Sequence, residues 1–376
     1  MIENKFVIFC PDHFNPLGVV RSLGEMGIKP DVILISETPS LVNNSNYVNV
    51  CHIVKDVVDG YNLLLREYGY KRDKVFLLAT SDDVEAFLDK HYLEIKDSFI
   101  FYNSGEQGRV SHMMNKNVII DMASACGLRV PKTELVRKGE LPLHLGFPVL
   151  TKAPISTIHN WKSNVFICHN AKELEEAYTH INLDKIVLQE YIEKRTELNY
   201  EGFAINDGKD VYISLDNQFI RTTSSSFGNY FYLERNSHPE LIDKIQNLIR
   251  LTRFNGIFEI EFLVGVDEQL YFLEINFRNS AWIYAYTSCG VNLPYMWAVS
   301  TLEGKLNTSS EKITKLPFKS MDELTDFKWS VLSGQVNFFV WLRQLWNVDS
   351  VFYYNKKDPK PFFSYLFFRL KGYFQH

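Results

Sequence analysis

The chain has 376 residues, of which 46% are hydrophobic and 23% are charged, and its formal net charge is −5 at pH 7. This length predicts two or three domains with a large buried core, and the composition is that of an ordinary globular protein. The acidic balance argues against a nucleic-acid partner.

The cysteines and the first residues of the chain indicate the cellular compartment of the protein. The five cysteines are odd in number and follow no paired spacing, which predicts reduced thiols rather than a disulfide framework. The first residues lack the basic and then apolar pattern of a secretory signal. No apolar run approaches the roughly 20 residues that a membrane-spanning helix needs. We therefore expect a cytoplasmic protein.

Residues 1–110 alternate between apolar strands and amphipathic helices. Strands are expected at residues 6–10, 31–36 and 74–79, and a helix at about 17–26. This alternation predicts an α/β domain with a doubly wound parallel sheet.

Two features of this first domain concern ligands. A dinucleotide-binding turn needs the spacing Gly-x-Gly-x-x-Gly after the first strand, and only Gly18 is found there, so hydride chemistry is not expected. Ser81, Asp82 and Asp83 follow a strand end, which is where open α/β sheets bind ligands. The same residues equally suit the start of the next helix.

Residues 111–185 carry two lysines at the ends of regular elements. A helix is expected over residues 115–126 with Lys116 at its start, and an apolar strand over residues 147–152 ends in Lys152. Lysine is a flexible point charge that suits phosphate groups, although a lone lysine is most often solvated.

The segment that follows Lys152 contains no glycine. A backbone nest that wraps phosphates through its N–H groups usually depends on glycines, which residues 153–163 lack. Ser156, Thr157 and Lys162 still supply polar groups in this loop. A glycine-based phosphate nest is therefore not assured in this loop.

A β-hairpin over residues 256–278 concentrates polar groups on one face. Its alternation places Glu261 across from Glu274 and Glu259 across from Asn276. Like charges that face each other across a strand pair destabilise it, so this pairing calls for a cation. Carboxylate and amide oxygens are ligands that Mg²⁺ takes together with substrate phosphates.

The same alternation assigns further residues of the hairpin. Phe272 and Arg278 are expected on the face of Glu274, and Ile260 and Ile275 on the opposite, apolar face. A solvated outer face of a surface hairpin is the alternative interpretation.

Residues 306–376 are rich in aromatic and basic side chains. Aromatic residues cluster at 337–346 and 361–371. The last segment contains five basic residues and one acid: Lys356, Lys357, Lys360, Arg369 and Lys371 against Asp358. A basic, aromatic helix suits a membrane surface, whereas packing on the protein body or at a subunit interface is the more common outcome.

The order of these motifs resembles that of the ATP-grasp superfamily over residues 110–305, and more weakly before them. The metal-binding signature of that superfamily is an acidic residue on one strand followed by Glu-x-Asn-x-Arg on the next. The corresponding residues here are Glu261 and then Glu274, Asn276 and Arg278.

The resemblance implies an ATP-grasp fold, α/β overall and α+β in the ATP-binding part, preceded by the doubly wound parallel-sheet domain. It divides the chain into an N-terminal domain (1–110), a small lid subdomain (111–185), a larger subdomain with the metal site (186–305) and a C-terminal extension (306–376).

The resemblance also assigns roles in binding ATP. Glu261, Glu274 and Asn276 bind Mg²⁺, for which Mn²⁺ can substitute. Lys116 and Lys152 bind the phosphates.

The strand over residues 185–193 resembles the adenine-binding linker of the superfamily. There Glu190 receives the exocyclic amine, and the Ile192 backbone addresses the ring nitrogens. Glu197 is the candidate for the ribose hydroxyls, with Glu201 as a weaker one.

Two arginines complete the expected site. Arg278 holds the transferring phosphoryl group or the carboxylate that receives it. Arg221 faces the phosphoryl acceptor, unless it forms a surface ion pair instead.

The function implied by the resemblance is that of an ATP-dependent carboxylate–amine ligase. Such an enzyme forms an amide through an acyl phosphate and releases ADP and phosphate. Its partners would be a small carboxylate and a small amine, with homodimers common in the family. The C-terminal tail is similar to tails of ligases resembling D-aspartate ligase and of relatives in surface-polysaccharide pathways, which suggests cell-envelope or surface-polysaccharide metabolism.

Two other functions stay open. One is another ATP-grasp reaction, such as carboxylation, carbamoyl-phosphate-type chemistry or thioester formation, for which no biotin-carrier or CoA-handling module is visible. The other is a nucleotide-binding module without turnover, which the glycine-free loop favours and the intact metal signature opposes.

Overall fold

A computed structural model describes residues 2–70, 72–154, 164–222 and 228–373, with side chains as far as Leu370. Within them the first sheet has five parallel strands in the order β3-β2-β1-β4-β5. Its strands are β1 (Phe6–Pro11), β2 (Asp31–Ile35), β3 (Cys51–Val54), β4 (Val75–Ala79) and β5 (Phe99–Phe101). The strand order reverses between β1 and β4, and open α/β sheets bind ligands at the carboxyl ends of such a pair.

Helices connect these strands and cover both faces of the sheet. They are α1 (Phe14–Glu25), η1 (Val42–Asn44), α2 (Val57–Tyr68), α3 (Asp82–Lys90) and α4 (Tyr92–Ile95). Strands β1 and β4 are apolar at nearly every position, as expected of parallel strands that are buried on both faces. The predicted doubly wound domain is therefore confirmed.

A smaller sheet follows, with strand order β6-β9-β7-β8. Its strands are β6 (Thr133–Arg137), β7 (Val149–Lys152), β8 (Ile167–Cys168) and β9 (Lys185–Glu190). Helix α7 (Ala171–His180) packs on it, and α5 (Arg109–Met113) and α6 (Lys116–Ala125) connect it to the first sheet. Asn115 caps α6 by accepting a hydrogen bond from the backbone N–H of Asn117, which places Lys116 at the first helical position.

The largest sheet of the described residues has the order β14-β13-β10-β11-β12-β15-β16. Its strands are β10 (Lys194–Ile205), β11 (Asp210–Thr222), β12 (Gly228–Glu234), β13 (Gly256–Gly265), β14 (Leu270–Asn276), β15 (Phe318–Met321) and β16 (Ser350–Val351). The helices between these strands are η3 (Pro239–Leu241), α8 (Ile242–Thr252), α9 (Ile283–Cys289) and α10 (Leu293–Glu303).

Helix α10 joins the first and the largest sheets into one core. Its fully buried Trp297 packs edge-on against Phe76 of β4, with ring centroids 5.5 Å apart, and against Tyr102 at 4.9 Å. The same helix contacts β10 and β13. The hairpin β13–β14 is thus held in a defined position relative to the first sheet.

The hairpin has the predicted pairing near its metal signature. Glu261 pairs with Glu274 and Glu259 with Asn276. Phe272 departs from the prediction, because the register shifts after Glu261 so that Phe272 pairs with Phe262 and is fully buried. A β-bulge adds one residue to a strand and moves the following side chain to the opposite face, an irregularity that strict alternation cannot anticipate.

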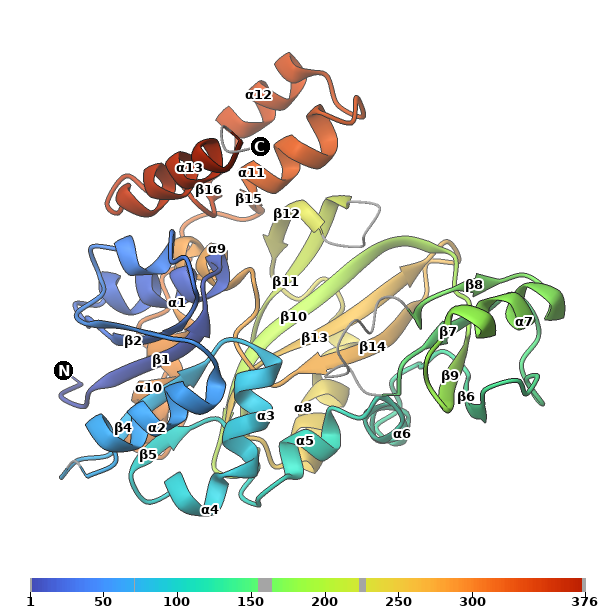
Figure 1. Cartoon of the computed structure of the whole chain (residues 1–376), viewed down its shortest axis with the longest axis horizontal. Coiled ribbons are helices and arrows are strands. Elements are labelled where there is room, and N and C mark those ends of the chain that lie inside the picture. The colour runs from blue at the N-terminus through green and yellow to red at the C-terminus, as the bar shows by residue number, and fades with distance from the viewer. Residues whose placement is uncertain (1, 71, 155–163, 223–227, 374–376) are drawn as a thin grey trace.

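The three sheets have distinct places in the molecule. Figure 1 shows the first sheet and the smaller sheet at opposite ends, with the long strands β10 and β13 between them. Strand β14 forms one edge of the largest sheet and β16 the other. The C-terminal helices therefore belong to the edge away from the hairpin (Figure 1).

The C-terminal extension consists mainly of short helices around β15 and β16. They are α11 (Glu323–Asp326), the π-helical turn η4 (Phe327–Val331), α12 (Phe338–Trp346) and α13 (Lys360–Tyr373). No helix in the described part of the chain is both long and apolar enough to span a membrane.

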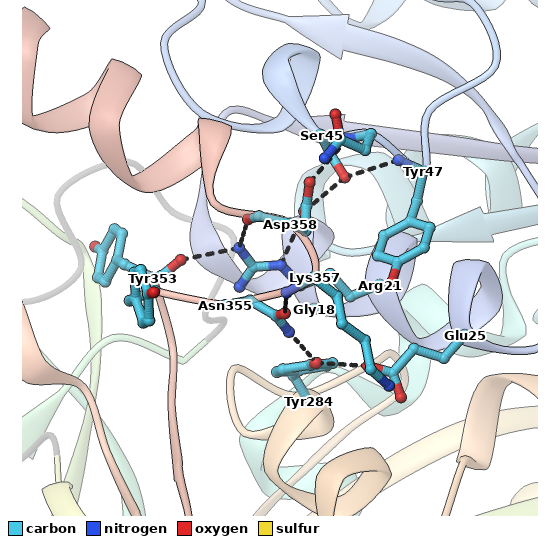
Figure 2. A network of polar contacts seen from close by, with 12 residues as sticks. Gly18, Arg21, Glu25, Ser45, Tyr47, Tyr284, Tyr353, Asn355, Lys357 and Asp358 are labelled. Carbon is cyan, nitrogen blue, oxygen red and sulfur yellow. Dashed lines mark hydrogen bonds and ion pairs between the residues drawn. The ribbon is translucent and has the colours of Figure 1, made fainter. Parts of the chain in front are cut away.

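A buried ion pair fastens this extension to α1 (Figure 2). Arg21 donates through Nε to Asp358 at 3.0 Å, and both side chains are fully buried. Arg21 also donates to the carbonyl oxygens of Phe352 and Tyr353 at 2.8 and 2.9 Å. Asp358 in turn accepts from the Ser45 hydroxyl at 2.8 Å. The extension is therefore part of the folded body rather than a loose tail.

Candidate active site

The candidate site lies on one face of three adjacent strands. Besides the pairs within the hairpin, β10 aligns Asn199 with Glu261 on the neighbouring strand β13. Side chains of Glu259, Glu261, Glu274 and Asn276 thus share this face with Asn199. Such a concentration of carboxylates and amides is unfavourable unless donors or cations surround it.

Hydrogen bonds divide the carboxylates into two kinds. Glu259 is surrounded by donors, namely Asn199 at 3.0 Å, Asn276 at 3.0 Å and the Trp282 indole at 2.9 Å. Among the described residues, Glu261 accepts only from Asn276, at 2.8 Å. Burial, followed by the charges of Glu274 and Glu259, raises the pKa of Glu261 well above its usual range. Glu259 is therefore held by three donors, whereas Glu261 has a single described hydrogen-bond donor.

Two lysines from different elements approach these carboxylates. The Lys116 ammonium lies 2.6 Å from Glu274 Oε2, and it is the leading cause that lowers the pKa of Glu274. Lys152, at the end of β7, donates to Gln189 at 2.8 Å. Burial first, and then the charge of Lys116, lower the pKa of Lys152 to about 8. The structure thus brings both predicted lysines to the predicted metal residues.

Arg278 follows β14 and connects the hairpin to the first sheet. Its Nε and Nη2 donate to the two oxygens of Asp82 at 2.7 and 3.2 Å, a bidentate pair. Nη2 also lies 3.3 Å from Asn276 Oδ1. Asp82 is in the first turn of α3, while Ser81 is the N-cap residue without a side-chain capping bond. The segment therefore begins α3, as one of the two expected roles has it, and it also contacts Arg278 through Asp82.

The carboxyl end of β1 contributes residues that the sequence did not single out. His13 caps α1 by accepting from the Asn15 N–H at 3.3 Å. Burial, followed by the charge of Arg278, lowers the pKa of His13 to about 4, so its imidazole is neutral at pH 7. Asn15 donates to the carbonyl oxygens of Thr80 and Asn279 at 3.2 and 3.0 Å. Only the position of His13 just after an apolar strand could have suggested it.

The predicted adenine-side residues lie along the connection from β9 to β10. Glu190, at the end of β9, accepts from the backbone N–H of Lys132 at 3.2 Å. Ile192 is half-buried in the linker, next to Gly265 of β13. Glu197 pairs with Lys194 at 2.9 Å. Burial raises the pKa of Glu197, and the charge of Glu274 adds to that effect.

Two expected residues are committed elsewhere. Glu201 is fully buried across from Glu259 on the neighbouring strand, and it accepts from the Ser280 hydroxyl. Arg221 makes a bidentate pair with Asp326 at 2.9 and 2.6 Å and also donates to Gln344 at 3.0 Å. These partners belong to the C-terminal extension, so the ion-pair alternative describes the contacts of Arg221.

The loop after Lys152 falls mostly outside the described residues. Ala153 and Pro154 are described, and the Pro154 carbonyl accepts from the Lys116 N–H at 3.2 Å. Ser156, Thr157 and Lys162 lie in the part that is not described.

The donor set fits Mg²⁺ only in combination with a ligand. In the described parts of the chain, no group of three His, Cys, Asp or Glu side chains is arranged to hold a metal ion. Glu261 and Glu274 offer two carboxylates, and beside them lies the Asn276 amide, whose nitrogen donates to Glu261 and whose oxygen accepts from Arg278 in this structure. Mg²⁺ is usually bound by one or two carboxylates plus substrate phosphates and water, so this set suits a metal that arrives with a nucleotide.

Comparison with known proteins agrees with this geometry. Residues 221–324 match the family described as ATP-grasp in the biosynthetic pathway with Ter operon. No curated protein matches the chain significantly in sequence.

Solved structures of similar fold include three enzymes. L-amino acid ligase from Bacillus licheniformis has a TM-score of 0.62 and 16% identity over 83% of this chain and 77% of its own. N5-carboxyaminoimidazole synthetase from Staphylococcus aureus has a TM-score of 0.63 and 14% identity over 85% and 83%. Biotin carboxylase from Campylobacter jejuni has a TM-score of 0.63 and 16% identity over 83% and 74%. The chain thus has the fold of these enzymes, and its residues 221–324 match an ATP-grasp family.

Proposed function

We propose that this protein is an ATP-dependent ligase that joins a carboxylate to an amine through an acyl phosphate. The observation that carries the proposal is the convergence of two enclosed ammonium groups on the same carboxylates: Lys116 pairs with Glu274 at 2.6 Å, and Lys152 lies close enough to feel the charges of Glu274 and Glu261. Alternating cations and anions of this kind suit a triphosphate with its metal. The ligase names of the structural neighbours and the biosynthetic description of the matched family support the same assignment.

The nucleotide would lie between the smaller sheet and the hairpin. Lys116 and Lys152 would neutralise its phosphates, and Glu190, Ile192 and Glu197 would line the adenine and ribose end. Mg²⁺, when bound, neutralises charge on the phosphate oxygens and keeps them in line. Glu261, Glu274 and Asn276 are the residues that would hold it. The synthetase from Staphylococcus aureus is also known with ADP, and another neighbour with MgADP.

The second substrate would bind where the hairpin meets the first sheet. A carboxylate oxygen attacks the γ-phosphorus, the bond from that phosphorus to the bridging oxygen breaks, and ADP leaves. The amine then attacks the acyl carbon, loses a proton to solvent, and expels phosphate that carries one carboxylate oxygen. Arg278, held by Asp82, would orient the carboxylate and the transferring group.

Trapping with hydroxylamine tests this proposal. Purified protein would be incubated with ATP, Mg²⁺, hydroxylamine and single members of a panel of amino acids and other small carboxylates. The expected result is a hydroxamate and an equal amount of phosphate with one class of acid, because hydroxylamine captures an acyl phosphate. Tight nucleotide binding without phosphate release from any acid would instead support the binding module. Phosphate release that requires bicarbonate and yields no hydroxamate would support carboxylation.

Nucleotide affinity is expected to fall as the pH rises through about 8. The pKa of Lys152 in the free protein is about 8, and a bound phosphate raises it, so binding takes up protons near this pH. Calorimetric titration with a nonhydrolysable ATP analogue in two buffers of different ionisation enthalpy measures that uptake. Lys152→Met should lose on the order of tenfold in affinity at pH 7 and also lose the pH dependence. Lys172→Met, at an exposed position of α7, is the matched control.

Asp82→Asn is expected to impair transfer while sparing nucleotide binding. The substitution removes the charge that fixes Arg278 but leaves the two lysines unchanged. Hydroxamate formation should fall about tenfold, as is usual when a supporting partner of a site residue is removed. Affinity for the ATP analogue should stay within about twofold by the same reasoning. The exposed neighbour variant Asp83→Asn should change neither quantity, and an equal loss in both variants would contradict the role of Asp82.

A further inference from the structure

The outer surfaces of α12 and α13 carry large apolar side chains that nothing in the described chain covers. In α12, Phe339 is 76% exposed and Trp346 is 89% exposed, and Leu342 lies between them in the same stripe. In α13, Phe363, Phe367 and Leu370 follow the same helical spacing and are also exposed. Other exposed apolar residues of the extension are Trp329, Leu332, Phe338, Val340, Tyr354 and Phe368.

This arrangement differs from ordinary scattered exposure. Helix α12 is anchored by Trp341, which packs against Phe327 and donates to Asp326 at 2.9 Å, and by the partly buried Leu345 in the same cluster. The exposed stripe is therefore a second apolar surface, on a helix that is already anchored. Contiguous exposed apolar surface on a folded protein marks an interaction site.

The charges of the extension are sorted by sign. Its acids point inward, where Asp326 pairs with Arg221, Asp358 pairs with Arg21, and Glu323 accepts from backbone N–H groups. Over residues 321–370, six basic residues are exposed: Lys328, Arg343, Lys356, Lys357, Lys360 and Arg369. The one exposed acid of that range is Asp349, which pairs with Lys315 at 2.6 Å. The outer surface is thus apolar and basic at once.

This charge pattern decides between two kinds of partner. In a two-fold dimer the same patch appears on both subunits, so a face with six exposed basic residues would oppose its own charge sign. An anionic lipid surface supplies the opposite charge together with an apolar layer into which aromatic side chains insert. Tryptophan and tyrosine are also enriched at the boundary between lipid and water.

We propose that the exposed faces of α12 and α13 dock the protein onto an anionic lipid surface. The contact is interfacial, since no helix of the described chain spans a bilayer. Because β16 and β14 are opposite edges of the largest sheet, docking leaves the β13–β14 hairpin uncovered. The proposal does not depend on the ligase activity, because it rests only on the surface of the extension.

Flotation of the full-length protein with lipid vesicles tests the proposal. We expect binding to vesicles of phosphatidylcholine mixed with phosphatidylglycerol, weak binding to phosphatidylcholine alone, and loss of binding in high salt. Binding should shift the tryptophan emission to shorter wavelength and make it quenchable by brominated lipid, because Trp346 enters the apolar layer.

Variants separate the apolar and the charged contributions. Phe339→Ser with Trp346→Ser, and Lys356→Glu with Lys360→Glu, should each weaken vesicle binding by at least about tenfold. The control is Leu143→Ser, since Leu143 is 84% exposed but lies outside the extension. Circular dichroism confirms folding, which changes at exposed positions should not disturb.

Three outcomes would overturn the proposal. The first is that the folded wild type fails to bind anionic vesicles, and the second is that it binds both vesicle types equally. The third is that light scattering shows a dimer, that the aromatic substitutions dissociate this dimer, and that the protein does not bind vesicles. The last would assign the face to a second copy of the chain.

Discussion

Replacing Glu261 by glutamine is expected to remove most of the Mg²⁺ dependence of nucleotide binding and, at the same time, to stabilise the empty protein. Burial and the neighbouring carboxylates raise the pKa of Glu261, so its ionised form at pH 7 is unfavourable in the folded state. The direction of the stability change follows from proton linkage. An acid with a raised pKa stabilises the folded state at low pH, and that contribution is lost as the pH rises through the raised pKa. Glutamine mimics the protonated acid and removes the repulsion.

Glu261→Gln is expected to weaken Mg²⁺ binding although it stabilises the empty protein. A neutral amide is a weaker ligand for a hard cation than a carboxylate. We expect the ratio of analogue affinities with and without Mg²⁺ to fall on the order of 100-fold, the upper end of what a displaced metal-site contact costs. Calorimetric titration gives that ratio, and a thermal melt without ligand gives the stability. A higher melting temperature combined with lost Mg²⁺ dependence identifies a functional carboxylate held at the expense of stability.

Glu274→Gln should differ from Glu261→Gln in its nucleotide affinity without Mg²⁺. Glu274 holds the Lys116 ammonium at 2.6 Å, so its loss makes that ammonium available to a phosphate even without metal. Affinity in the absence of Mg²⁺ is therefore expected to rise or stay constant, while the gain on adding Mg²⁺ disappears. Glu268→Gln changes an exposed carboxylate in the turn of the same hairpin and is the matched control. Unchanged Mg²⁺ dependence in both site variants would contradict the metal assignment.

Arg21→Met is expected to cause the largest loss of stability in the chain, about 3–5 kcal/mol. The substitution leaves Asp358 as a fully buried carboxylate without its cation, and it leaves the carbonyl oxygens of Phe352 and Tyr353 without that donor. Removing one partner of a buried pair is costly because the other charge remains desolvated. Denaturant unfolding at pH 7 measures the change.

Two comparisons make this result specific. Arg21→Met with Asp358→Leu should recover part of the loss, since no uncompensated charge remains buried. Arg66→Met removes an arginine that is 69% exposed and should cost less than about 1 kcal/mol. Limited proteolysis should release the C-terminal extension sooner in Arg21→Met, because this pair joins the segment just before α13 to α1. Equal stability of Arg21→Met and Arg66→Met would show that the pair does not anchor the extension.

Periodicity predicted the elements that carry the candidate site. The pairing of Glu261 with Glu274 follows from alternation and a short turn, and the structure confirms it. The parallel sheet of the first domain follows from its buried apolar strands, and it is confirmed as well. Phe272 was misplaced, because one bulged residue reverses the face and leaves no mark in the alternation.

Contacts between distant segments were beyond the reach of the sequence pattern. Asp82 and Arg278 are separated by 196 residues, and no local periodicity links them. Arg221 was expected near the phosphoryl acceptor, but its contacts with Asp326 and Gln344 arise from the packing of a C-terminal extension whose position the sequence did not indicate. His13 was overlooked because its proximity to Arg278 depends on how the hairpin packs against β1.

The most direct measurement of the central claim is calorimetric titration of the wild-type protein with a nonhydrolysable ATP analogue, with and without Mg²⁺. The account predicts one site per chain, affinity in the micromolar range with Mg²⁺, and much weaker binding when the metal is chelated. Circular dichroism of the same sample establishes that the protein is folded. Absence of binding by folded protein at millimolar analogue and Mg²⁺ would contradict the assignment of Lys116, Lys152, Glu261 and Glu274 to an ATP site.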